Sequence, residues 1–209
     1  MDAALAQAQD ISAHYKVMCG VKRVAITGGI ACGKSLVAEY LNELGYATID
    51  ADDVAHELIS PEERARLAKV VFRDPAARKA LEARLHPVIR SRIEAWLAGS
   101  GEASASPVGP ASPASPVRIA IVPLLFEVHW DEDYDIICCV TSGKENQIAR
   151  MMATRGYTRD EAEARMSAQM PLKEKAAKSH YVIANDGSPD DLRAAVAQFA
   201  EWLGSPSRQ

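Results

Sequence analysis

Short strand-like runs alternate with helix-like stretches along most of the chain. Residues 22–29 (KRVAITGG) form a β-rich run that leads into glycines, and residues 34–44 place apolar side chains at helical spacing until Gly45. Residues 46–50 (YATID) have the composition of a second short strand. The first part of the chain is therefore predicted to run strand, glycine-rich turn, helix, strand.

The middle of the chain favours helices and then changes composition. Residues 52–96 show no obvious strand, and the Ser-Pro at 60–61 and Asp-Pro at 74–75 are typical of a helix cap and first turn. Residues 99–117 hold mostly small side chains and four of the chain's 11 prolines. Because such a segment buries too little apolar surface to offset its ordering entropy, we expect a flexible surface loop without chemistry.

Continuous apolar runs mark the second half of the chain. Residues 117–127 (VRIAIVPLLFE) and 134–140 (YDIICCV) predict buried strands of parallel type, and residues 179–186 (SHYVIAND) predict a last strand. Patterns typical of helix starts are Ser142 with Glu145, Thr158 with Glu161, and Ser188 with Pro189. Together these elements predict an α/β fold with helices on both sides of a sheet.

Composition places the chain in a broad class. Its 209 residues are 48% hydrophobic and 25% charged, as in an ordinary globular protein, and suffice for a single domain over residues 1–209. The net charge of -4 gives no strong field toward nucleic acid or an anionic membrane, so we expect neither as a partner. Oligomeric state stays open.

The cysteines and the first residues bear on the compartment. Cys19, Cys32, Cys138 and Cys139 form no CxxC pair and have no metal-ligand spacing with the histidines. Cys138 and Cys139 lie inside an apolar run and are expected to be buried thiols. Residues 1–20 resemble neither a signal peptide nor a membrane span, so we expect an N-terminal extension of a cytoplasmic protein.

Residues 28–35, GGIACGKS, carry the strongest chemical signal. A glycine-rich turn between a strand and a helix directs backbone N–H groups and the positive helix end at an anion. Lys34 would reach the β- and γ-phosphates of a nucleotide, and the Ser35 hydroxyl would ligate Mg²⁺. The expected nucleotide-contacting residues of this turn are Gly28, Gly29, Ile30, Ala31, Cys32, Gly33, Lys34, Ser35 and Leu36. The alternative is a tight turn without a ligand, but the strand before and the helix after favour phosphate binding.

A phosphate-binding turn alone fits a GTPase, a transport ATPase or a small-molecule kinase. Residues 46–58, YATIDADDVAHEL, place carboxylates just past the second strand, at the sheet edge where ligands of open α/β sheets bind. Asp50, Asp52 and Asp53 are the candidates to orient an acceptor hydroxyl and accept its proton, or to hold metal-bound water. Asp53 is instead interpreted as a helix cap.

Several motifs in order resemble dephospho-CoA kinases. They are TGGIACGKS, IDADDVAHEL, LHP at 85–87, PLLFE at 123–127, the arginine-bearing stretch QIARMMATRGYTRDEAEARMSAQMP, and HYVIANDGS. The resemblance covers about residues 21–202. It implies a P-loop nucleoside-triphosphate-hydrolase-like three-layer sandwich with a mainly parallel sheet, a helical lid (142–170) and a shortened helical acceptor lobe (52–98). It also implies transfer of the γ-phosphate of ATP, with Mg²⁺, to the ribose 3′-hydroxyl of dephospho-CoA.

Residue roles follow from the same resemblance. Asp52 matches the proposed catalytic base, whereas Asp50 is interpreted as structural. Arg64 and His86 match positions near the acceptor, although His86 could equally cap or pack beneath it at a helix start. Arg150 lies on the helix that resembles the lid, where it would neutralise charge on the transferring phosphoryl group. Asn185 and Gly187 resemble the loop that borders the adenine.

Departures from the family pattern leave alternatives open. Thr154 stands where relatives commonly have a second lid arginine, so the role of Arg155 is undefined. Leu36 replaces a usual threonine, and only SPEE separates Ile59 from Arg64 in the acceptor lobe. The alternatives to an active dephospho-CoA kinase are a nucleotide-binding protein with lost or altered catalysis, or a kinase for another small hydroxyl acceptor.

Overall fold

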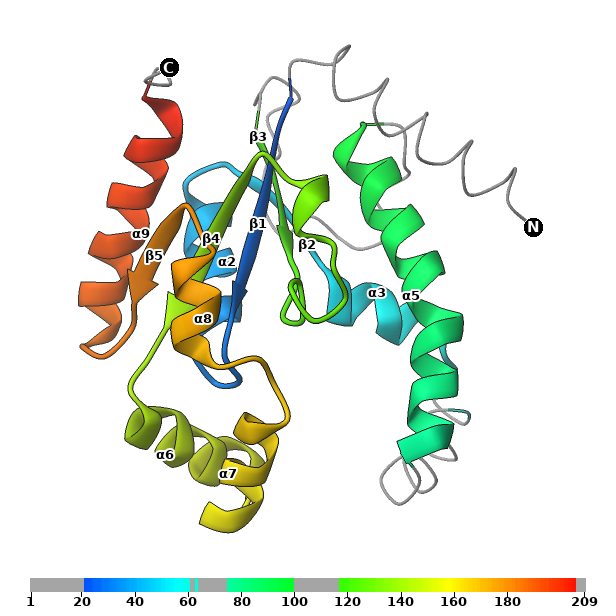
Figure 1. The fold of residues 1–209 in the computed structure, drawn as a ribbon. Helices are drawn as coiled ribbons and strands as arrows, with labels where there is room; N and C mark the ends of the chain where they lie inside the picture. Colours follow the sequence, from blue (N-terminus) through cyan, green and yellow to red (C-terminus); the bar gives the residue numbers. More distant parts are fainter. Residues whose placement is uncertain (1–20, 61–62, 64–74, 100–116, 206–209) are drawn as a thin grey trace.

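A five-stranded, wholly parallel sheet forms the centre of the protein (Figure 1). A computed structural model describes residues 21–60, 63, 75–99 and 117–205. The strand order is β2-β3-β1-β4-β5, so β1 lies in the middle and pairs on both sides. The strands are β1 (Lys22–Gly28), β2 (Ala47–Asp50), β3 (Val117–Ile121), β4 (Ile136–Thr141) and β5 (Tyr181–Ala184). The predicted α/β class with a mainly parallel sheet is confirmed.

Helices cover both faces of this sheet. On one face, α2 (Lys34–Glu43) and α9 (Pro189–Gly204) pack against the alternate strand residues that include Val24 and Ile26. On the other, α3 (Ala51–Leu58) and α5 (Pro75–Leu97) pack against Ala25 and Ala120. The short helix α8 (Leu172–Ala177) contacts β1 and β4, and Figure 1 shows it in front of the sheet with α2 behind. The result is the expected three-layer sandwich.

Two helices between β4 and β5 lie beyond the carboxyl ends of the strands (Figure 1). They are α6 (Lys144–Arg155) and α7 (Arg159–Ser167), which pack on each other through Ile148, Met151 and Ala162. Their place in the chain matches the predicted lid segment. The predicted capping box of Thr158 with Glu161 is confirmed, as is the start of α9 at Ser188 with Pro189.

Two predicted elements are wrong in their extent or their cap. The run 117–127 is a strand only to Ile121, because Pro123 has no N–H for the ladder and the chain turns there. Ser142 does not cap α6, whose N-cap is Gly143. Its hydroxyl instead donates to the Asn185 carbonyl (2.9 Å) and to Asp186 Oδ1 (3.0 Å), so long-range contacts displaced the local cap.

The helical middle of the chain also differs in one detail. His86 and Pro87 lie inside α5 rather than at a helix start, so the expected position of this His-Pro pair is wrong. The proline is accommodated within one long helix. Three predictions fall outside the described residues: the N-terminal extension 1–20, Arg64, and all of the 99–117 loop except its end residues. Within the described part of the chain, no helix is long and apolar enough to cross a membrane.

Candidate active site

The turn from β1 into α2 has the geometry of an anion-binding loop. Gly28 has φ +145°, and a Cβ there would lie 2.2 Å from the Val140 carbonyl oxygen. Gly33 has φ +94°, and a Cβ there would lie 2.2 Å from Asn185 Nδ2. Both positions therefore require glycine for conformation and for space. The loop is held between the central strand and the end of β5, which explains why this sequence folds into a fixed cradle.

Lys34 lies inside this cradle. Its Nζ donates to the carbonyl oxygens of Gly28 (3.3 Å) and Gly29 (2.8 Å). Burial lowers the pKa of Lys34 from its usual value, whereas the carboxylates of Asp50 and Asp52 oppose this shift. Among the described residues its hydrogen-bond partners are these carbonyl oxygens, so the partly desolvated ammonium can turn to a nucleotide phosphate, where its charge is better balanced.

The carboxylates after β2 have different tasks. Asp50 caps α3, because its Oδ1 accepts the Asp52 backbone N–H at 2.8 Å; the expectation that Asp53 forms this cap is wrong. Burial raises the pKa of Asp50 to about 6, and its acidic neighbours Asp52 and Asp53 add to this. The Asp52 side chain is exposed and makes no hydrogen bond to any other described residue. The Asp52 carboxylate is thus open to a ligand.

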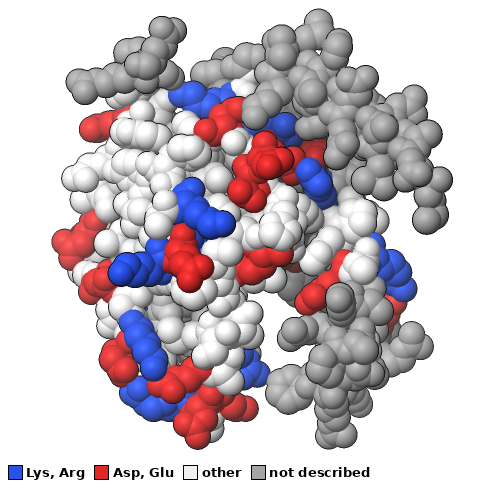
Figure 2. Space-filling model, in the orientation of Figure 1, with Lys and Arg blue, Asp and Glu red and all other residues white. Residues whose placement is uncertain are grey.

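Asp52 lines a mostly apolar pocket of about 280 Å³ between α3, α5 and the turn after β3. His86 also lines it, and its ring meets Trp130 edge to face at a centroid distance of 5.9 Å. Figure 2 shows that the surface is hollowed beside the α6–α7 pair. The pocket brings together two expected acceptor residues, and Trp130 is a further wall residue that the sequence had not singled out.

Arg150 ties α6 to the phosphate-binding loop. Its guanidinium donates to the carbonyl oxygens of Ala31 (3.3 Å) and Asn185 (2.9 Å) and to Ser142 Oγ (3.2 Å). Asn185 is buried, and its Nδ2 donates to the Cys32 carbonyl oxygen at 2.9 Å. Arg150 and Asn185 therefore both lie beside the loop and brace it, whereas the roles expected for Arg150 at the phosphoryl group and for Asn185 at the adenine stay predictions.

The remaining expected residues occupy different positions around the loop. Ile30 and Ala31 pack against the α6–α7 cluster, Leu36 packs against the α2–α9 core, and Cys32 is buried. Burial raises the pKa of the Cys32 thiol. Gly187 lies against the cap of α9, where a Cβ would approach Asp191 Oδ2 to 2.5 Å, so its closeness to adenine stays a prediction.

The oxygen groups near Lys34 fit a magnesium ion bound together with a nucleotide. Ser35 is exposed in the first turn of α2, and the Asp52 carboxylate has no competing hydrogen bond among the described residues. Mg²⁺ usually takes few protein oxygens and completes its shell with phosphates and water. The described residues contain no cluster of three His, Cys, Asp or Glu side chains that could hold a metal by themselves.

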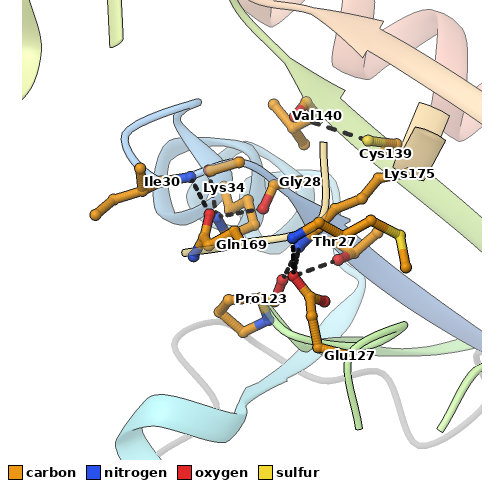
Figure 3. A network of polar contacts seen from close by, with 12 residues as sticks. Thr27, Gly28, Ile30, Lys34, Pro123, Glu127, Cys139, Val140, Gln169 and Lys175 are labelled. Atoms are coloured by element: carbon orange, nitrogen blue, oxygen red, sulfur yellow. Dashed lines mark hydrogen bonds and ion pairs between the residues drawn. The ribbon is translucent and has the colours of Figure 1, made fainter. Parts of the chain in front are cut away.

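A network behind the loop was not predicted from the sequence (Figure 3). Lys175 is fully buried on α8, and its Nζ contacts Glu127 Oε1 (2.7 Å) and the Pro123 carbonyl oxygen (2.8 Å). Glu127 Oε1 also accepts the Met170 N–H at 3.0 Å, and Ile30 N–H donates to Gln169 Oε1 at 3.0 Å. Both Glu127 and Gln169 lie in motifs of the quoted resemblance, PLLFE and SAQMP, which was the available signal.

Comparisons with known proteins identify the family of this chain. The dephospho-CoA kinase family model matches residues 22–65 and 62–191. The dephospho-CoA kinase of Geobacter sulfurreducens is 36% identical over 198 residues, covering 84% of this chain and 95% of that protein. A Thermus thermophilus crystal structure has a TM-score of 0.66 at 33% identity, covering 87% of this chain and 97% of its own. The dephospho-CoA kinase structure from Campylobacter jejuni has a TM-score of 0.62 at 25% identity, with coverages of 87% and 96%. This chain belongs to the dephospho-CoA kinase family.

Proposed function

We propose that the protein transfers the γ-phosphoryl group of ATP to the ribose 3′-hydroxyl of dephospho-CoA, giving coenzyme A and ADP. The observation that carries this proposal is the placement of Asp52. Its carboxylate, which has no hydrogen bond to another described residue, lines the pocket and also lies within electrostatic reach of Lys34 in the phosphate-binding loop. One carboxylate therefore borders both the nucleotide side and the acceptor side.

On the nucleotide side, the loop N–H groups and Lys34 hold the phosphates. Lys34 gives up its two carbonyl contacts and neutralises charge on the β- and γ-phosphates. Arg150 keeps the loop against α6 and adds positive charge near it. Ser35 would hold Mg²⁺ together with the phosphate oxygens, and the ion would supply charge neutralisation.

On the acceptor side, the apolar pocket holds the substrate while Asp52 orients its hydroxyl and accepts the proton. His86 and Trp130 form one wall, and their edge-to-face contact fixes both rings. The apolar lining excludes water from the attacking group, which favours transfer to the hydroxyl over hydrolysis. Arg64 is proposed as a further acceptor contact on the basis of the resemblance alone.

Direct product analysis tests the proposal. The purified protein is incubated with ATP, Mg²⁺ and dephospho-CoA, and formation of CoA and ADP is followed by mass spectrometry, with the phosphate position assigned by NMR. We expect ADP release to depend on dephospho-CoA. ADP release without CoA, or no reaction despite ATP binding, would favour the alternatives of altered acceptor or lost catalysis.

A pocket variant adds a second, independent readout. Ala55→Phe fills the pocket from α3, so we expect a raised KM for dephospho-CoA with a nearly unchanged KM for ATP. Ala194→Phe, at an exposed position of α9, serves as the matched control and should leave both values unchanged. Equal effects of Ala55→Phe on both substrates would show that the acceptor does not use this pocket.

A further inference from the structure

The side chain of Gln169 occupies a backbone donor of the phosphate-binding loop. Its Oε1 accepts the Ile30 N–H at 3.0 Å, although the two residues are far apart in the sequence. Gln169 is half-buried after the end of α7, and among the described residues its carboxamide nitrogen donates no hydrogen bond. One end of the amide is therefore fixed, while two N–H groups have no protein acceptor in the described part of the chain.

The position of Gln169 is fixed from behind. Its own N–H donates to the Met166 carbonyl oxygen at 3.1 Å, and the next N–H, of Met170, donates to Glu127 Oε1 at 3.0 Å. Glu127 is in turn held by the fully buried Lys175 at 2.7 Å. Donors that are fixed before a ligand arrives stabilise developing charge without reorganisation cost.

Gln169 lies at the half of the loop on which the Lys34 side chain rests. Lys34, which in such loops reaches the β- and γ-phosphates, rests on the carbonyl oxygens of Gly28 and Gly29. Ile30 follows directly, and Figure 3 shows the Gln169 carboxamide beside Lys34 at this first half of the loop. The inner phosphates belong to the other half, where the N-terminus of α2 begins at Lys34.

We propose that Gln169 is a γ-phosphate contact: its carbonyl keeps the Ile30 N–H in place while its carboxamide N–H donates to an oxygen of the transferring phosphoryl group. The inference rests on the proposed function only in requiring a nucleoside triphosphate in the loop, not on the identity of the acceptor. It gives the enzyme a way to distinguish ATP from ADP and to stabilise charge on the phosphoryl group during transfer.

Two substitutions separate this role from a purely structural one. Gln169→Glu keeps an acceptor for the Ile30 N–H but replaces the donor with a negative charge. Gln169→Ala removes both functions. Binding of β,γ-methylene ATP and of ADP, each with Mg²⁺, is measured by calorimetry, together with kcat and the thermal midpoint. Gln198→Glu, at an exposed position of α9, is the matched control for the added charge.

We expect Gln169→Ala to weaken binding of the ATP analogue by about tenfold, which is the scale of one lost hydrogen bond to a charged group. Its affinity for ADP should change much less. Gln169→Glu should weaken binding of the analogue further, by about 10²-fold, because the introduced carboxylate and the phosphate are both negative and lie close together. Both should lower kcat, and Gln198→Glu should match the unsubstituted protein. If Gln169→Glu does not fold, the affinities of Gln169→Ala for the analogue and for ADP decide between a phosphate contact and a purely structural role.

The outcomes that would overturn the role are equally distinct. If Gln169 only latches the loop, Gln169→Ala will weaken binding of the analogue and of ADP alike. Unchanged binding in both variants has the same consequence. If dephospho-CoA is not phosphorylated but the contrast between analogue and ADP holds, the acceptor assignment fails and the Gln169 contact stands.

Discussion

Asp50→Asn should stabilise the protein at neutral and alkaline pH. Asp50 caps α3 through a hydrogen bond from the Asp52 N–H, and an asparagine keeps the side-chain oxygen that this cap needs. The carboxylate itself is disfavoured, because burial and the nearby Asp52 and Asp53 raise its pKa from 3.8 to about 6. The substitution removes the unfavourable charge and leaves the cap.

The sign and size of the effect follow from this shift. A carboxyl whose pKa is higher in the folded state favours folding when protonated. That contribution is complete below about pH 3.8 and is lost as the pH rises through about 6. About two pKa units correspond to about 3 kcal/mol, and partial exposure of the side chain reduces this to about 2 kcal/mol. For a chain of this size the thermal midpoint should rise by about 4–8 °C at pH 8.

Thermal unfolding of both proteins from pH 4 to pH 8 measures the effect. We expect nearly equal midpoints at pH 4 and a difference that grows through pH 6. Kinase activity should be largely kept, because the role that the structure shows for Asp50 is to cap α3 and an asparagine keeps that cap. A variant that is less stable at pH 8 would show that the ionised carboxylate strengthens the cap more than burial weakens it. Loss of activity with normal folding would give Asp50 a chemical role.

Further predictions concern the reaction and its framework. Lys34→Ala should lower turnover by about 10²–10³-fold or more, and near-normal turnover would remove the P-loop assignment. Asp52→Asn should keep ATP affinity, measured by calorimetry, while kcat falls by about 10²–10⁴-fold, with the lower end favoured for a loose transition state. Arg150→Lys should lower the thermal midpoint as well as kcat, because one ammonium cannot replace its contacts to Ala31, Ser142 and Asn185; an unchanged midpoint would argue against bracing. The short SPEE connection predicts weak discrimination between dephospho-CoA and adenosine or AMP, and strong rejection of both by kcat/KM would show that no longer segment is needed.

Local patterns were sufficient for the loop and most elements. The GGIACGKS stretch predicted a phosphate-binding turn because its glycines, lysine and serine stand at fixed spacing between a strand and a helix, and the structure has that turn. The run 117–127 was extended too far, since a continuous apolar run does not distinguish a strand from the buried turn that begins at Pro123. A proline in such a run is the local sign that the strand ends there.

Contacts between distant segments were beyond the sequence. Ser142 has the spacing of a helix cap, but Asn185 and Asp186, which arrive from the next strand, take its hydroxyl. The same holds for Lys175, whose lysine side chain is fully buried only because Glu127 and the Pro123 carbonyl oxygen meet it across the fold. Short-range periodicity contains no information about which far residue will supply such a partner.

The central position of β1 has a consequence for the order of folding. This strand leads directly into the phosphate-binding loop, yet its two neighbours, β3 and β4, both come from the second half of the chain. Closing such distant pairings is slow, and the loop has no fixed base until they form. We therefore expect ATP to stabilise the finished sheet rather than to guide its assembly. In native-state hydrogen exchange, the β1 amides should be among the last to exchange. Nucleotide should slow their exchange only because it lowers the fraction of globally unfolded chains.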